Sequence, residues 1–96
     1  MNHLLSIKKQ LELIKPSLMS RYYVSELGLF GSVVRNDFSG ESDIDILVDF
    51  SQPIGIEFID LAEELETRLK RKVDLVSKKG VKPQYLKTIQ ADLIYV

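Results

Sequence analysis

Residues 24–50 read VSELGLFGSVVRNDFSGESDIDILVDF, and this stretch decides the fold. Two apolar runs, at 24–30 and 43–50, flank a glycine, a serine and a polar segment. The second run alternates apolar and mostly acidic residues, which is typical of a strand that buries one face. One face holds Ile44, Ile46 and Val48, and the other holds Asp43, Asp45, Leu47 and Asp49. We therefore predict strands over 24–30 and 43–50, joined by a short helix over 32–36 and a polar loop to Ser42.

Upstream of this stretch, apolar residues recur at spacings of three and four between positions 4 and 18. This pattern predicts an amphipathic helix. Pro16 interrupts it, because proline lacks a backbone donor and clashes with the preceding turn. We expect one helix over about 2–15 and a second short helix that begins at Pro16. The stripe is expected to enter the core, whereas Leu5 and Leu13 leave room for a protein interface.

Downstream, Ser51 and Pro53 suit the N-cap and the first turn of a third helix. Its apolar stripe runs from position 58 to position 69. Two pairs of opposite charge, four residues apart, are expected on its exposed face. These pairs are Glu64 with Arg68 and Glu66 with Lys70.

A third strand is predicted over 72–77, followed by a turn at 78–80 and a last helix that begins at Pro83. Helices and strands therefore alternate after the first two helices. The chain 1–96 is expected to form one α/β domain in which helices pack on a three-stranded sheet.

Composition limits the classes of function. The chain has 96 residues and a net charge of −1, so no basic field would attract nucleic acid and no direct nucleic-acid binding is expected. Cysteine is absent, which excludes disulfides and thiolate metal sites. No apolar run approaches the roughly 20 residues that span a bilayer. We expect a soluble cytoplasmic protein without a membrane partner.

The acidic face of the second strand indicates a cation site. Asp43 and Asp45 are two residues apart, so their side chains point the same way and repel each other unless a cation lies between them. Mg²⁺ is such a cation, because it prefers carboxylate, phosphate and water oxygens. Gly31 permits close approach of the backbone, and Ser32 begins a helix whose free N–H groups can receive phosphate.

A third carboxylate is expected if the chemistry is phosphoryl transfer with two metal ions, because two ions need shared ligands. Asp74 is the best candidate, since it lies alone among apolar residues of a strand. If the third strand pairs beside the second, Asp74 joins Asp43 and Asp45.

A family resemblance rests on residues 29–48, where Gly31-Ser32, ten further residues and then Asp43-Ile44-Asp45 follow one another. This pattern resembles the signature of the polymerase-β-type nucleotidyltransferase superfamily. Its spacing is that of the minimal nucleotidyltransferase branch, which includes the MntA proteins of MntA–HepT toxin–antitoxin pairs. The resemblance implies the fold of that superfamily, a small mixed β-sheet with flanking helices.

The resemblance also implies a reaction. Gly31 and Ser32 would hold the phosphates of ATP, Asp43 and Asp45 would bind Mg²⁺, and Asp74 would complete the metal site and help deprotonate the acceptor. AMP would be transferred and pyrophosphate released. The implied partner is a HEPN-domain toxin of the HepT type, modified on a tyrosine, so a hetero-oligomer is possible.

Each of these residues also has a structural interpretation. Arg35 either steadies a phosphate or ties down the loop through Asp37 or Glu41. Asp43 and Asp45 also fit an exposed edge strand, Asp74 an exposed strand position or a helix cap, and Gly31-Ser32 an ordinary turn with an N-cap serine. The spacing of the glycine–serine pair from the two aspartates favours the catalytic interpretation.

Size favours a macromolecular acceptor, since larger nucleotidyltransferases use an additional domain to hold the acceptor and this chain has no room for one. We therefore expect an adenylyltransferase that modifies a protein and acts as an antitoxin. Two alternatives remain: a non-catalytic antitoxin that neutralises its partner by occlusion, and a nucleotidyltransferase subunit that acts on a small molecule or an RNA end.

Overall fold

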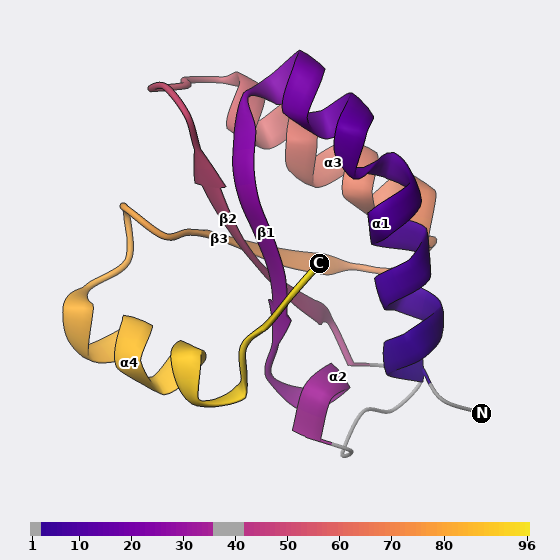
Figure 1. The fold of residues 1–96 in the computed structure, drawn as a ribbon, viewed down its shortest axis with the longest axis vertical. Coiled ribbons are helices and arrows are strands. Elements are labelled where there is room, and N and C mark those ends of the chain that lie inside the picture. The colour runs from indigo at the N-terminus through magenta and orange to yellow at the C-terminus, as the bar shows by residue number, and fades with distance from the viewer. Residues whose placement is uncertain (1–2, 36–41) are drawn as a thin grey trace.

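A computed structural model describes residues 3–35 and 42–96 and places four strands between helices (Figure 1). The elements are α1 (His3–Tyr22), β1 (Val24–Phe30), α2 (Ser32–Arg35), β2 (Ile44–Phe50), α3 (Glu57–Leu69), β3 (Val73–Ser77), α4 (Pro83–Asp92) and β4 (Ile94–Tyr95). The strand order is β3-β2-β1-β4. Because β2 pairs antiparallel with β1 and parallel with β3, the sheet is mixed, and the predicted α/β class with flanking helices is confirmed.

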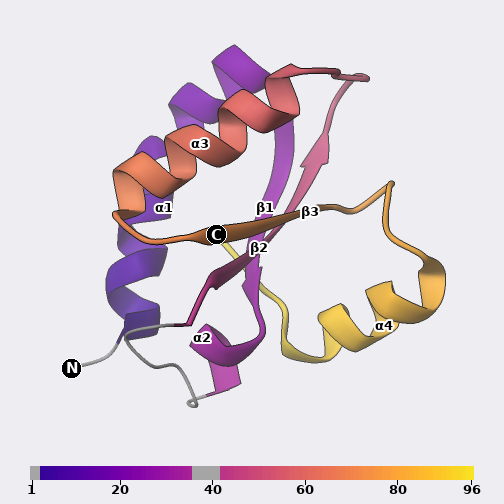
Figure 2. The same cartoon turned by 180° about the vertical axis from the view of Figure 1, so that it is seen from behind.

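The core lies between one face of the sheet and two helices. Figures 1 and 2 show α1 and α3 side by side against this face, while α4 lies on the other side. The apolar side chains that alternate along β1 and β2 point toward α1 and α3, as the period of two predicts. Fully buried members of this core are Leu11, Leu18, Leu27, Leu29, Ile44, Ile46, Val48, Leu61 and Leu65.

The prediction of two helices before β1 is wrong, because α1 continues through Pro16 as one helix. Pro16 is exposed, so water can solvate the carbonyl group that proline leaves without a partner. Ile7, Leu11 and Leu18 form one buried stripe along α1, and Leu18 is completely buried beyond the proline. Burial of that stripe offsets the lost hydrogen bond.

α3 begins at Glu57, later than the start predicted from Ser51 and Pro53. The Ser51 N–H and hydroxyl both donate to the Tyr23 carbonyl oxygen, at 2.8 and 3.3 Å, so Ser51 connects the end of β2 to the junction before β1. At the observed start the Gly55 N–H donates to the Glu57 carboxylate at 2.8 Å.

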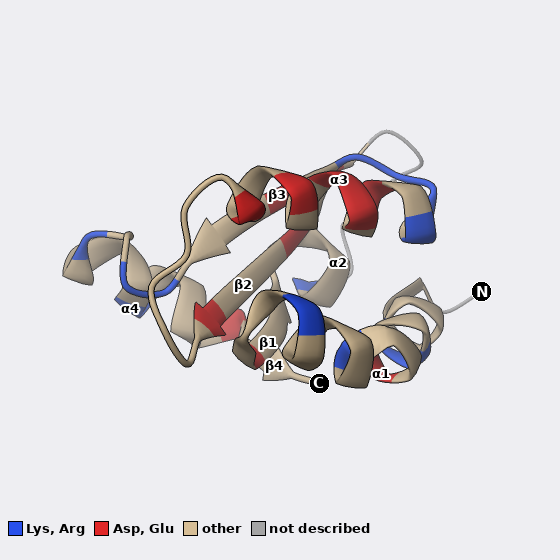
Figure 3. Cartoon of the chain, turned by 90° about the horizontal axis from the view of Figure 1, so that it is seen from above, with Lys and Arg blue, Asp and Glu red and all other residues tan. Residues whose placement is uncertain are grey.

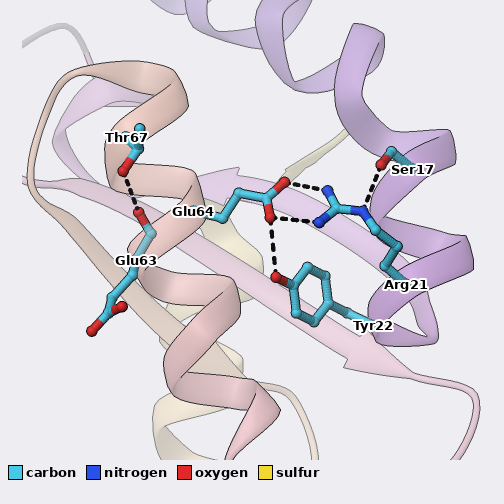
Figure 4. A network of polar contacts seen from close by, with 6 residues as sticks. All are labelled: Ser17, Arg21, Tyr22, Glu63, Glu64 and Thr67. Atoms are coloured by element: carbon cyan, nitrogen blue, oxygen red, sulfur yellow. Dashed lines mark hydrogen bonds and ion pairs between the residues drawn. The ribbon is translucent and has the colours of Figure 1, made fainter.

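Glu64 and Glu66, which were predicted to pair with Arg68 and Lys70, form hydrogen bonds to other elements, and the charge of Arg68 also acts on Glu64. Glu64 accepts hydrogen bonds from the Arg21 guanidinium and from the Tyr22 hydroxyl, which joins α3 to α1 (Figure 4). The Arg21 hydrogen bond is the main reason that the pKa of Glu64 lies below its ordinary value. Glu66 accepts from the Val73 N–H at 3.0 Å and so joins the end of α3 to the start of β3.

The short strand β4 was not predicted. Ile94 pairs with Leu29 and Tyr95 with Gly28, which makes β1 an inner strand. The Val96 N–H extends the ladder by donating to the Leu27 carbonyl oxygen at 2.8 Å. Two residues are too few to show an alternating pattern, so the sequence carries no signal for this strand. Within residues 3–35 and 42–96, no helix has the length and apolar character needed to cross a membrane.

Candidate active site

Gly31 forms the turn between β1 and α2, and a carboxylate packs directly against it. Its φ of +75° lies in the left-handed region that favours glycine. A Cβ atom at this position would lie 2.1 Å from Asp45 Oδ2, which is closer than side chains tolerate. The Gly31 carbonyl oxygen accepts from the Val34 and Arg35 N–H groups, at 3.0 and 3.1 Å, so α2 is built on the same turn. Glycine at this position therefore lets the carboxylate of Asp45 approach the start of α2.

The register between β2 and β3 places acidic residues of the two strands side by side. Asp45 pairs with Phe30 on one side and with Asp74 on the other, so the expectation that the third strand lies beside the second is confirmed. Asp43 lies one residue before β2. The Ile44 N–H donates to the Lys72 carbonyl oxygen at 2.9 Å, which fixes the start of β2 against the start of β3. Figure 3 shows acidic positions in β2 and in its neighbour β3.

Burial and neighbouring negative charges both act on Asp45. Partial burial, followed by the negative charges of Asp74 and Asp43, raises the pKa of Asp45 from 3.8 to about 6. Arg35 opposes this rise, and a hydrogen bond with Asp74 adds to it. Asp45 and Asp74, which face each other across the two strands, therefore disfavour each other's negative charge.

A hard cation fits the chemistry of this face. The donors are carboxylate oxygens, which Mg²⁺ prefers, and a cation between Asp45 and Asp74 would relieve the repulsion between their negative charges. Asp43 and Asp74 are exposed, so they are accessible from solvent. Among the residues that the structure describes, no three acidic, histidine or cysteine side chains already converge as a metal cluster.

Arg35 has a partner that the sequence analysis missed. Its Nη1 donates to Asp92 Oδ2 at 3.0 Å, which connects α2 to the last residue of α4. The partners suggested from sequence, Asp37 and Glu41, lie outside the described residues. Aspartate at the C-terminal end of a helix faces the negative end of the helix dipole. That unfavourable position was the one sign in the sequence that Asp92 needs a basic partner.

The other charged residues of the sheet lie at its opposite end. Asp49 accepts from the Phe50 N–H at 3.0 Å and lies 3.9 Å from Lys79 Nζ. Lys78 forms an ion pair with Glu26 at 3.0 Å. A mainly apolar pocket of about 420 Å³ also lies at this end, lined by Phe50, Gln52, Pro53, Ile54, Phe58, Ser77 and Lys79, and none of the predicted site residues lines it.

A glycine turn before a short helix faces paired carboxylates on adjacent strands of a small mixed sheet, as the resemblance to nucleotidyltransferases implied. Residues 11–96 match the family model described as the nucleotidyltransferase domain, and the chain belongs to this family. The predicted family and the prediction of an enzyme are therefore confirmed.

Similar proteins agree with this assignment. The chain is 45% identical over 83 residues to the protein adenylyltransferase MntA of Thermococcus cleftensis, covering 85% of this chain and 84% of that protein. A solved minimal nucleotidyltransferase is 29% identical, with a TM-score of 0.80, over 95% of this chain and 93% of that one. The fold also matches, with a TM-score of 0.66 and 23% identity, a complex of a tri-AMPylated Shewanella oneidensis HEPN toxin with an MNT antitoxin, over 95% of this chain and 68% of that one. The superfamily fold expected from the sequence is thereby confirmed.

Proposed function

We propose that this chain is a Mg²⁺-dependent protein adenylyltransferase, which transfers AMP from ATP to a tyrosine of a HEPN toxin and so acts as an antitoxin. The observation that carries the proposal is the pairing of Asp45 with Asp74 beside the Gly31 turn. The adenylyltransferase named in Thermococcus cleftensis supports the reaction. The AMPylated toxin bound to an MNT antitoxin supports the kind of partner.

Each residue has a role in this reaction. Gly31 and Ser32 bind the phosphates at the turn that begins α2, and Arg35 contributes a positive charge beside them. Asp43, Asp45 and Asp74 hold Mg²⁺, which when bound neutralises charge on the phosphates and on the carboxylates. The glycine turn keeps the carboxylate of Asp45 against the phosphate-binding segment.

The tyrosine oxygen of the partner attacks the α-phosphorus of ATP, a new O–P bond forms, and the bond from that phosphorus to the bridging oxygen of pyrophosphate breaks. Asp74 accepts the tyrosine proton, a role that requires a carboxylate within reach of the incoming hydroxyl. Because Asp74 is exposed, a residue on the surface of a large partner can reach it.

Transfer of label from ATP tests the reaction. The chain, Mg²⁺, ATP labelled at the α-phosphate and the HEPN partner are incubated, and the partner should gain the label. Asp43→Ala should abolish labelling. Asp49→Ala removes a carboxylate from the other end of β2, beside Lys79, and should leave labelling intact. Labelling that survives Asp43→Ala would overturn the site assignment, and an unlabelled partner with wild-type protein would overturn the function.

A non-catalytic antitoxin is the second candidate, because α1 leaves large apolar side chains exposed, among them Leu13 and Leu5. Leu13 is 82% exposed and Leu5 is 55% exposed. Under this alternative, a variant with Asp43→Ala and Asp45→Ala would neutralise the toxin as fully as the wild type. Loss of neutralisation by a double variant that still forms the complex would exclude occlusion.

A further inference from the structure

Asp92 occupies a position that its own helix disfavours. It is the last residue of α4, where the helix dipole presents its negative end, and the last turn of α4 carries no basic residue. Its side chain is nevertheless three-quarters covered, and Oδ2 accepts a hydrogen bond from Arg35 Nη1 at 3.0 Å. The ion pair with Arg35 offsets the unfavourable helix position.

Arg35 belongs to the turn that holds the catalytic face together. Its N–H donates to the Gly31 carbonyl oxygen at 3.1 Å, and the same glycine packs against Asp45 Oδ2. Its guanidinium lies near enough to Asp45 for its positive charge to act on that carboxyl group. Within residues 3–35 and 42–96, Arg35 is the basic residue nearest in sequence to the proposed phosphate site.

The segment that follows Asp92 is held firmly. Ile94 pairs with Leu29 in the sheet. At Gly28, a Cβ atom would lie 2.7 Å from Leu93 Cδ1 and 3.4 Å from Tyr95 Cδ1, so these two side chains pack closely against the glycine. Asp92 is therefore attached to β1, the strand that leads into Gly31. A fixed acceptor of this kind restricts the rotamers of a long side chain such as arginine.

We propose that Asp92 is a positioning residue that holds the guanidinium of Arg35 in place to contact the phosphates of ATP. The inference rests on the proposed function, because it assumes that this site binds ATP. A purely structural ion pair would fasten α4 to α2 and leave nucleotide affinity unchanged once the chain is folded. A purely electrostatic role would make Asp92 repel the nucleotide, so that its removal would tighten binding.

Binding of the non-hydrolysable analogue AMP-PNP separates these possibilities. Isothermal titration calorimetry in Mg²⁺ and 150 mM salt is applied to the full chain and to Asp92→Asn, each checked by thermal denaturation. We expect Asp92→Asn to weaken binding about threefold to fivefold, the range of a partly exposed ion pair. Asp92→Glu, which keeps the charge, should recover most of the affinity. In AMP transfer, Asp92→Asn should raise KM for ATP and leave kcat near the wild-type value, because Asp43, Asp45 and Asp74 are unchanged.

The coupling between the two residues is the decisive measurement. In an Arg35→Ala background, Asp92→Asn should have no further effect on AMP-PNP affinity. The matched control is Glu26→Gln, which removes an ion pair with Lys78 that is also 3.0 Å long and partly exposed, and which should leave affinity unchanged. Tighter or unchanged binding by Asp92→Asn, or an equal effect in both backgrounds, would overturn the inference. If wild-type protein binds no AMP-PNP, the proposed function itself fails.

Discussion

Replacing Gly31 with alanine should damage the reaction much more than it damages the fold. At φ +75° an alanine costs about 1–3 kcal/mol of backbone strain. Its Cβ would lie 2.1 Å from Asp45 Oδ2, so the carboxylate must move. That oxygen is the end of a side chain at a partly exposed position, and rotation away from the turn relieves the contact. We therefore expect unfolding free energy to fall by about 1–3 kcal/mol, which is the backbone strain alone.

The same rotation moves Asp45 away from Asp74 and from the proposed phosphate site at the glycine turn. Misplacement of a catalytic group by about 1 Å can lower a rate by roughly 100-fold. We expect Gly31→Ala to lower the rate of AMP transfer by about that factor, measured as initial rates with labelled ATP at saturating partner. Urea denaturation followed by circular dichroism supplies the unfolding free energy.

Gly80→Ala is the matched control. The nearest atom to a Cβ atom at position 80 would be Ser77 Cβ at 3.6 Å, an ordinary contact. This variant should therefore transfer AMP at the wild-type rate. Wild-type activity in a folded Gly31→Ala protein would refute the reasoning, because it would mean that the contact between the glycine turn and Asp45 is not needed.

Three further predictions concern charge. Because the pKa of Asp45 is raised from 3.8 to about 6, the native metal-free protein binds more protons than the unfolded chain between these values, and its stability should fall as the pH rises through this window. Urea denaturation in chelator should show this slope, and Asp45→Asn should flatten it. Addition of Mg²⁺ at pH 7.5 should raise the melting temperature of the wild type and not that of Asp45→Asn, since a cation that binds only the native state stabilises it. Glu64→Gln should lower the urea midpoint at pH 7, and the loss should shrink as the pH falls below 4.5, because Arg21 lowers the pKa of Glu64 and its contribution disappears on protonation.

The parts of the fold that could be predicted are those in which a local pattern coincides with burial. Ile44, Ile46 and Val48 of β2 are all fully buried, as expected for the face of a strand that helices cover, although Leu47 on the other face is buried as well. The parallel neighbour of β2 could be inferred from chemistry, since a lone Asp74 in an apolar strand needs a partner. The prediction that the first helix ends before Pro16 is wrong. The effect of a proline on its local backbone can be read from the sequence, whereas the burial of Leu18 beyond it depends on tertiary packing.

The parts of the site that could be predicted are likewise those whose residues lie close together in the sequence. Asp43 and Asp45 are separated by one residue, and Gly31 lies next to Ser32, so their spacing is visible in the sequence. The contact of Arg35 with Asp92 spans 57 positions and depends on where α4 ends. No periodicity connects two such residues, so the sequence suggests partners for Arg35 only in the neighbouring loop.

The parallel pairing of β2 with β3 has a consequence for the order in which the protein folds. Antiparallel contact between β1 and β2 can bring Gly31 and Asp45 together early, because few residues separate the two strands. Asp74 reaches Asp45 only after the whole of α3 has crossed the sheet and closed a longer loop. A chain emerging from the ribosome would therefore gain its glycine turn first and its third carboxylate later. The proposed active site would therefore be complete only after the crossover through α3 has closed.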